Sequence, residues 1–216
     1  LGPITVCAYS YMSLVPIIQP PIMRALTSKN ERRIRMPYTQ RVISRRTRIL
    51  FPLTVTLLVG ILVPFATPLI GMLMLGNLMR ESGAVERLTK ASSQEIANVV
   101  TLFLGLAIGS TMQAEFFLKL DTLKILVLGI LAFGLDTAAG LLFAKGLNWA
   151  SRGGLNPLIG AAGISAFPMA ARVVQRVGQE EDFENFLLMH AMGANAAGQV
   201  ASVVAGGVLL ALMGAG

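Results

Sequence analysis

Long segments without a charged side chain limit what this chain can fold into more than any other feature of its sequence. Residues 1–23 and 51–79 contain no Asp, Glu, Lys or Arg, and residues 125–144 contain only Asp136. Of the 216 residues, 54% are hydrophobic and 13% are charged, whereas about a quarter of the residues in soluble domains are charged. The sequence therefore predicts an all-α polytopic membrane protein.

Proline residues interrupt two of these uncharged segments. Three prolines between residues 16 and 21 predict that the first membrane helix breaks or ends near Val15. Residues 51–79 contain two further prolines and would form a helix longer than the hydrocarbon core, which is roughly 30 Å thick. We expect one span followed by a bent segment or half-helix there.

The rest of the chain predicts a connector and further helices. Residues 80–94 are polar and predict an exposed connector, and residues 96–113 predict a short or tilted helix. Residues 125–144 form the most conventional spanning segment. Residues 186–216 predict either one helix or a helix broken near Gly193.

Residues 151–171 are apolar but contain four glycines and two prolines. This composition predicts a re-entrant or unwound segment that is buried in protein, because exposed irregular backbone is costly in lipid. The sequence Pro-Leu-Ile-Gly occurs both here, at residues 157–160, and in the earlier interrupted segment, at residues 68–71. Paired interruptions are typical of transporters built from inverted repeats around a site at the membrane midplane.

Basic residues are concentrated between Arg24 and Arg48, a stretch that holds nine of the 18 Lys and Arg residues and only one acidic residue, Glu31. A basic segment between two apolar ones indicates a cytoplasmic loop. The net charge of +7 is thus explained by membrane topology, and we expect no nucleic-acid partner.

Asn156, Gly160 and Ser165 are the leading candidates for an ion site. A carboxamide and a hydroxyl on a glycine-loosened backbone offer neutral oxygens, which suit hard cations. The alternative is structural: Asn156 caps a helix that begins at Pro157, and Ser165 bonds to its own helix backbone. The spacing alone leaves both interpretations open.

Other polar residues also have two interpretations. Arg172 could hold a carboxylate, although its position alone favours a membrane anchor at a helix end. Asn195 shares one helical face with Gln199 and Ser202, where helix–helix hydrogen bonding is the common role and ion binding the alternative. His190 is expected to be interfacial or structural.

Asp136 is the one acidic residue deep within an apolar segment, so it is either functional or close to a helix end. Tyr11 is either an interfacial tyrosine or a phenol that faces a cavity. The sequence has no Walker loop, no clustered Cys/His metal site, no GxSxG and no dinucleotide fingerprint.

Four stretches closely resemble the β subunits of sodium-pumping, biotin-dependent decarboxylases, and the resemblance covers essentially the whole chain. The most specific is NPLIGAAGISAFPMAARV at residues 156–173, followed by NFLLMHAMGAN at residues 185–195. YSYMSLVPIIQPPIM at residues 9–23 and TPLIGMLMLGN at residues 67–77 match other parts of the same family.

The resemblance implies a translocase of the cell inner membrane that decarboxylates carboxybiotin, consumes a proton and exports Na⁺. Carboxybiotin would arrive on a separate chain, the biotin-carrying carboxyltransferase α subunit, which would also determine the acyl substrate. A small membrane γ or δ subunit and further β subunits would complete the complex.

The same resemblance implies roles for individual residues. Asn156, Gly160 and Ser165 match the polar motif of the ion and proton pathway, and we add Asn195 to the predicted metal ligands. Tyr11 matches a functional tyrosine, and Arg172 matches the arginine downstream of the motif. We therefore expect Tyr11, Ser165 and Arg172 to act in catalysis and Arg172 to contact carboxybiotin.

One family motif is not in this sequence. The glycine-rich GG(A/S)DGP motif, with its acidic sodium-site residue, is expected shortly before Leu1, so the chain resembles the C-terminal half of a β subunit. Two other functions remain open at this point: a sodium-coupled secondary transporter that does not use biotin, and a structural fragment without activity.

Overall fold

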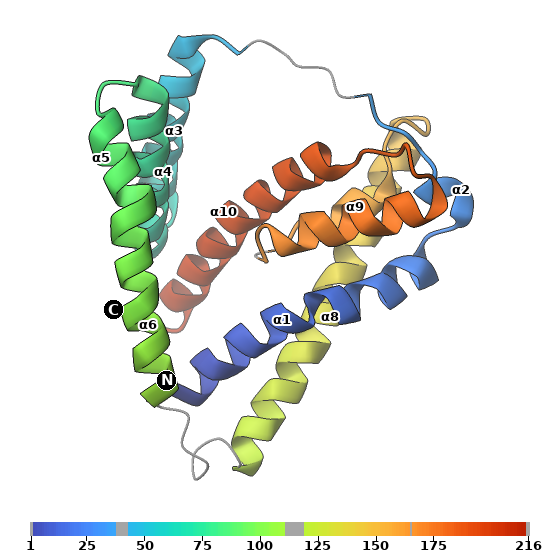
Figure 1. Cartoon of the computed structure of the whole chain (residues 1–216), viewed down its shortest axis with the longest axis horizontal. Coiled ribbons are helices and arrows are strands. Elements are labelled where there is room, and N and C mark those ends of the chain that lie inside the picture. Colours follow the sequence, from blue (N-terminus) through green and yellow to red (C-terminus); the bar gives the residue numbers. More distant parts are fainter. Residues whose placement is uncertain (1, 38–42, 111–118, 165, 215–216) are drawn as a thin grey trace. The chain divides into compact units, whose positions relative to one another are not determined.

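The computed structural model of the chain describes residues 2–37, 43–110, 119–164 and 166–214, with side chains from residue 13 onward (Figure 1). The described secondary structure is entirely helical, which confirms the predicted all-α fold class. The chain forms two compact units, and we describe each by itself. One comprises Leu1–Thr39 and Ile108–Gln199, and the other comprises Gln40–Ala107 and Val200–Gly216.

In the first unit, helix α1 packs against α8, and a short 3₁₀ helix, η3, packs against both α8 and α9. The core between them is apolar and includes Val15, Met23, Leu141 and Leu158, all fully buried. The elements are α1 (Gly2–Leu26), α2 (Lys29–Arg32), α8 (Leu120–Ala150), η3 (Pro157–Ala162), α9 (Met169–Glu181) and the first part of α10 (Leu188–Leu212).

Helix α1 continues without a break to Leu26, so the predicted break near Val15 is wrong. Each proline removes one backbone donor, but packing against a neighbouring helix can keep such a helix intact. Val15, Gln19 and Met23 recur at intervals of four residues and are fully buried, so one face of α1 is held by the core.

In the second unit, α3 and α4 pack against each other, and a short 3₁₀ helix, η1, separates them. The interruption expected within residues 51–79 is therefore confirmed. The segment expected as a connector, residues 80–94, is instead largely helical, which corrects that prediction. The elements are α3 (Arg45–Leu62), η1 (Pro64–Ala66), α4 (Thr67–Ser82), α5 (Glu86–Ala91), η2 (Ser92–Ile96), α6 (Ala97–Ser110) and the last part of α10.

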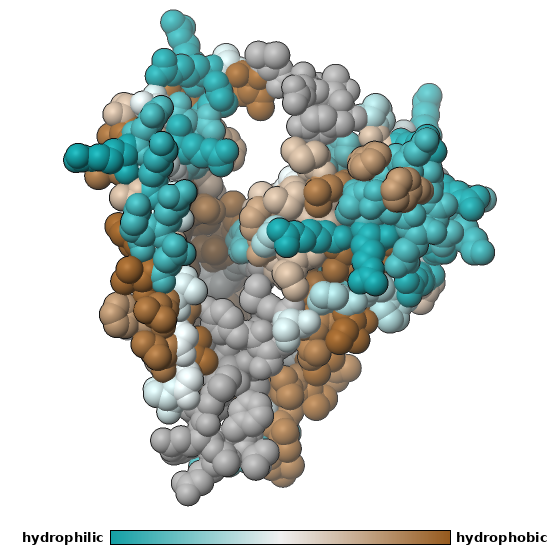
Figure 2. All heavy atoms as spheres, viewed as in Figure 1, coloured by the Kyte–Doolittle hydropathy of each residue, from teal (hydrophilic) through white to brown (hydrophobic). Residues whose placement is uncertain are grey.

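In the described part of the chain, three helices are long and apolar enough to cross a membrane: Glu86–Ser110, Leu120–Ala150 and Leu188–Leu212. The last is continuous through Gly193, so of the two alternatives for residues 186–216 the single helix is correct. Leucine side chains along α8 are largely exposed, which is expected of a surface that faces lipid. Within the first unit, Figure 2 shows hydrophobic atoms along the N-terminal half of α8 and hydrophilic atoms around α2.

Candidate functional site

The site is built around an irregular segment between α8 and α9. Turns at residues 151–155 lead to Asn156, the N-cap of η3, and Pro157 occupies the first turn. Regular helix does not resume until Met169. Proline and glycine explain this break, because proline is favoured at the first turn of a helix and glycine weakens regular structure. Its re-entrant placement in a membrane stays a prediction.

Both the oxygen and the nitrogen of the buried Asn156 carboxamide form hydrogen bonds. Its Oδ1 accepts a hydrogen bond from the Leu158 backbone N–H at 3.0 Å. Its Nδ2 donates to the backbone carbonyls of Arg32 at 3.0 Å and Ile34 at 2.8 Å. The capping interpretation therefore describes the geometry, and Asn156 also attaches η3 to the end of α2. Its role as a cation ligand stays a prediction.

Gly160 permits an unusually close approach between η3 and α8. A Cβ on Gly160 would lie 2.6 Å from the Ala144 Cβ and even closer to the Gly140 carbonyl oxygen. The reverse holds at Gly140, where a Cβ would overlap the Gly160 carbonyl. Packing against α8 therefore explains why residue 160 is glycine, and the predicted approach of its backbone to an ion is a separate proposal.

Asn195 reaches the same irregular segment from α10. It is fully buried, and its Nδ2 donates to the Ile164 carbonyl at 2.6 Å. Its Oδ1 is also buried, and no donor among the described residues reaches it. A close approach accompanies this contact, because a Cβ on Gly198 would lie 2.6 Å from the backbone of Gly163. Of the predicted ligands, Asn195 thus has a buried oxygen without a protein donor in the described part of the chain.

Gln19 is a residue of this region that sequence reasoning missed. Its Nε2 donates to the Ala161 carbonyl at 2.8 Å and lies 3.5 Å from the Thr137 hydroxyl. Its Oε1 is buried and, among the described residues, has no donor. The sequence does contain a signal for this residue: Gln19 is a carboxamide within an uncharged segment, and it lies between Pro16 and Pro20.

The remaining predicted residues are placed less completely. Ser165 and the side chain of Tyr11 lie outside the described residues. Arg172 is exposed on α9, and within the described residues its guanidinium has no ion-pair partner. Asp136 lies on an exposed face of α8, next to the buried Thr137, and well inside the helix. A position near a helix end therefore does not explain why an acidic residue occurs at position 136.

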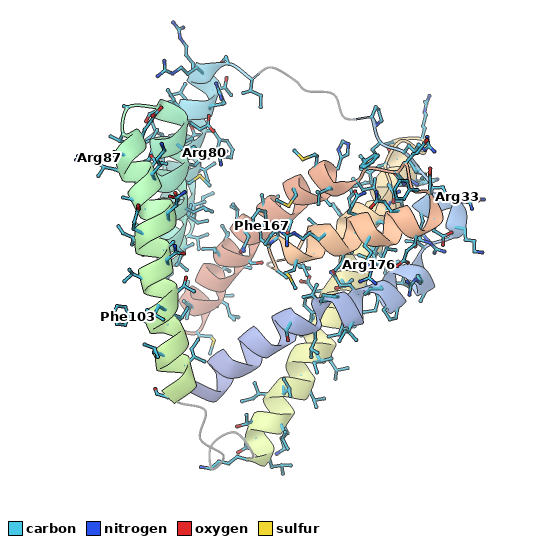
Figure 3. The ribbon with its side chains drawn as sticks, in the orientation of Figure 1. Arg33, Arg80, Arg87, Phe103, Phe167 and Arg176 are labelled. Atoms are coloured by element: carbon cyan, nitrogen blue, oxygen red, sulfur yellow. The ribbon has the colours of Figure 1, made fainter. Side chains whose placement is uncertain are left out.

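A cluster of ion pairs connects the predicted basic loop to the acidic residues in the last turn of α9 and just after it, and the sequence did not predict this arrangement. Arg32 has a side chain only 7% exposed and donates to Glu181 at 2.6 Å. Arg35 is 56% exposed and pairs with Asp182 and Glu184. Arg24 pairs with Glu180 at 2.6 Å. In Figure 3, Arg33 lies beside α2 and Arg176 lies on α9 in this charged region.

These contacts change the acidity of the partners. The hydrogen bonds from Arg32, together with its charge, lower the pKa of Glu181. The hydrogen bonds from Arg35 lower the pKa of Asp182, and the same contacts raise the pKa of Arg35. The lowered pKa values favour the ionised carboxylates of Glu181 and Asp182, so these two ion pairs connect α2 and the residues that follow it to the C-terminal end of α9.

Carboxylates do not provide an ion site elsewhere in the described residues, where no group of three or more His, Cys, Asp or Glu side chains could hold a metal ion. The irregular segment offers a different chemistry: neutral carboxamide oxygens and backbone carbonyls, supplied by separate helices. Such oxygens are suitable ligands for a hard cation.

Comparison with known proteins identifies the family. Residues 1–213 match the family described as the Na⁺-transporting oxaloacetate decarboxylase beta subunit. The chain is 58% identical to the methylmalonyl-CoA decarboxylase subunit beta of Propionigenium modestum, over 99% of this chain and 54% of that protein. It is also 58% identical to the oxaloacetate decarboxylase beta chain 2 of Salmonella typhimurium, over 97% of this chain and 48% of the relative.

A second methylmalonyl-CoA decarboxylase subunit beta, from Veillonella parvula, is 52% identical over 99% of this chain and 57% of its own length. The chain thus spans about half the length of the curated relatives it matches. The match nevertheless extends across both compact units and includes the irregular segment and α10. This chain belongs to the family of Na⁺-transporting oxaloacetate decarboxylase beta subunits.

Proposed function

We propose that the chain is part of the membrane subunit of a decarboxylase complex, in which decarboxylation of carboxybiotin with consumption of a proton drives Na⁺ export. Family membership supports the coupling of a decarboxylase to sodium transport. The observation that carries the proposal is the buried Oδ1 of Asn195, which has no donor among the described residues and lies beside the irregular segment. A buried acceptor without a donor is unfavourable, and a bound cation relieves that cost.

In this proposal, the transported Na⁺ binds at oxygens of Asn156, Ser165 and Asn195. Gly160 allows the irregular backbone to lie close to α8 and so sets where the carbonyls of the segment point. Neutral ligands suit a monovalent cargo, because a site with little net charge can both bind and release the ion.

Arg172, Tyr11 and Ser165 are proposed to act on the carboxybiotin side of the reaction. The exposed guanidinium of Arg172, without an ion-pair partner among the described residues, is suited to a two-pronged contact with a carboxylate. Carboxybiotin, which another chain carries, supplies the carboxyl group that is released as CO₂. Tyr11 and Ser165 provide hydroxyl groups that can carry the proton the reaction consumes.

The proposed surroundings follow from this assignment. The subunit is a multi-pass protein of the cell inner membrane. Its partners are a biotin-carrying carboxyltransferase α subunit, a small membrane γ or δ subunit and further β subunits. Nucleic acid is not among these partners, because membrane topology accounts for the concentration of basic residues between Arg24 and Arg48.

Transport of ²²Na⁺ into inverted membrane vesicles tests the function. The assembled complex should accumulate ²²Na⁺ when carboxybiotin is supplied, and accumulation should stop when avidin blocks biotin. The Asn195→Leu variant should lose most of this uptake while the complex still assembles. Uptake that follows an imposed ion gradient and ignores avidin would instead indicate a secondary transporter.

The topology of the first unit gives a separate prediction. Lys145, near the C-terminal end of α8, donates to the Leu26 carbonyl at 3.0 Å and pairs with Glu31 at 3.3 Å, so this end of α8 lies beside α2. Helix α8 has 31 residues and is about 46 Å long, enough to cross a core of roughly 30 Å. Asn30, in α2, and Asp121, in the first turn of α8, should therefore lie on opposite sides of the membrane.

Membrane-impermeant maleimide tests this arrangement in a Cys7→Ser background. Asn30→Cys should be labelled only in inverted vesicles, because the basic loop is cytoplasmic. Asp121→Cys should be labelled only in intact cells, and its side chain is 87% exposed, so access is not the limit. Labelling of both cysteines from the same side would contradict the orientation of α8.

A further inference from the structure

Gln19 occupies a position in α1 where the local chemistry is unusual for a membrane helix. It is fully buried, and prolines stand three residues before it and one residue after it. Pro20 has no N–H to bond the carbonyl of Pro16, so the helix near Gln19 retains a backbone acceptor that regular hydrogen bonding does not use. A buried polar side chain and a carbonyl that lacks its regular helical hydrogen bond therefore occur together on one stretch of α1.

The orientation of the Gln19 amide is fixed by its partners. Nε2 donates to the Ala161 carbonyl at 2.8 Å, and a carbonyl accepts only from a donor. Turning the amide around would place Oε1 against that carbonyl oxygen, with two acceptors in contact. Oε1 must therefore point away from Ala161, and there it is buried, with no donor among the described residues.

Asn195 repeats this arrangement from a different helix. Its Nδ2 holds the Ile164 carbonyl, and its Oδ1 likewise lacks a donor among the described residues. Ala161 and Ile164 are three residues apart in one segment, so their Cα atoms are at most about 11 Å apart. Two carboxamides, from α1 and α10, thus use their NH₂ groups to hold the same irregular segment and leave both of their oxygens buried.

We propose that Gln19 is a ligand of the transported cation, which it contacts through Oε1 as Asn195 does through Oδ1. The inference rests on the proposed function and adds a residue from α1 to the site. Sodium takes oxygen ligands from carbonyls and amides, and here it supplies the positive partner that two buried acceptors need. The Nε2 contact holds the ligand in position before the ion arrives.

Sodium-dependent thermal stabilisation of the purified complex, measured in NaCl against choline chloride, tests this role. Gln19→Met preserves side-chain length and removes the oxygen. It should raise the half-saturating Na⁺ concentration about tenfold, which corresponds to the loss of one charge-assisted contact. The same shift should appear in the Na⁺ dependence of carboxybiotin decarboxylation.

Gln175→Met is the matched control. Both ends of the Gln175 side chain bond within the protein: Nε2 donates to the Asn185 carbonyl at 3.2 Å, and Oε1 accepts from the Leu188 N–H at 2.7 Å. This variant should lower the melting temperature and leave the half-saturating Na⁺ concentration at the parental value. The same outcome for Gln19→Met would assign Gln19 a structural role and overturn the proposal.

If Gln19→Met does not assemble, Gln19→Asn provides the test, because it keeps the carboxamide and withdraws it by one methylene. We expect a raised Na⁺ requirement and an altered preference between Li⁺ and Na⁺, and parental values of both would overturn the proposal. Failure of the proposed function is recognised separately, since the parental complex would then show no stabilisation by Na⁺.

Discussion

Replacing Gly140 with alanine is expected to destabilise the protein by about 3 kcal/mol, because the new Cβ would overlap the Gly160 carbonyl oxygen. Backbone atoms cannot rotate away as a flexible side chain can, so η3 would have to separate from α8. Titration with SDS in mixed micelles measures the free energy of unfolding. The displaced segment should also bind Na⁺ less well, since it provides the carbonyls that Gln19 and Asn195 hold.

Gly146 offers the matched control on the same helix. A Cβ there meets no atom within 4 Å, and replacing glycine by alanine inside an exposed helix stabilises it by roughly 0.5–1 kcal/mol. Gly146→Ala should therefore be neutral or slightly stabilising. Equal effects at the two glycines would show that α8 and η3 do not approach each other as closely as the structure has them.

Arg32→Met is expected to lower the free energy of unfolding clearly, because it removes a guanidinium whose side chain is only 7% exposed and leaves the acceptors of that guanidinium without their donor. The Arg32 guanidinium donates to Glu181 through Nε at 3.0 Å and Nη2 at 2.6 Å, and through Nη1 to the Thr27 carbonyl. Arg35→Met is the control: its guanidinium is largely exposed, so solvent screens its pairs with Asp182 and Glu184. We expect a much smaller change in SDS resistance for Arg35→Met.

The pH dependence distinguishes loss of the ion pair from loss of packing. Arg32 depresses the pKa of Glu181, so the stabilisation from the pair is present above the ordinary glutamate pKa and is lost as the pH falls through the lowered value. The difference in the free energy of unfolding between the parent and Arg32→Met should therefore become smaller at acidic pH. A difference that stays constant down to low pH would mean that the methionine costs stability through packing alone.

Much of the fold followed from the uncharged segments and their interruptions. Pro64 and Pro68 correctly predicted the break between α3 and α4, because proline cannot continue the hydrogen bonding of a helix. The same rule failed in α1, where three prolines lie within a continuous helix. The difference lies in tertiary packing: one face of α1 is fully buried against the core, and a local sequence rule does not include that contribution.

The candidate site was predictable in part. Asn156 and Asn195 could be chosen from the sequence because each is a carboxamide in or near a glycine-rich apolar segment. Their partners could not, since Asn156 bonds to carbonyls more than 120 residues away. Gln19 was not predicted for the same reason. Its place in the candidate site depends on a contact with Ala161, and the residues next to Gln19 in the sequence do not indicate that contact.

The carboxamides that hold the irregular segment have no titratable proton, and this limits how the protein can handle charge. An ion bound by Gln19, Asn156 and Asn195 keeps its full positive charge, so the transmembrane voltage acts directly on the loaded site; moving one charge through 100 mV corresponds to about 2.3 kcal/mol. Because pH cannot switch these ligands, proton uptake has to occur at other groups. Acid would then compete with sodium only indirectly, and voltage would set the steepness of export.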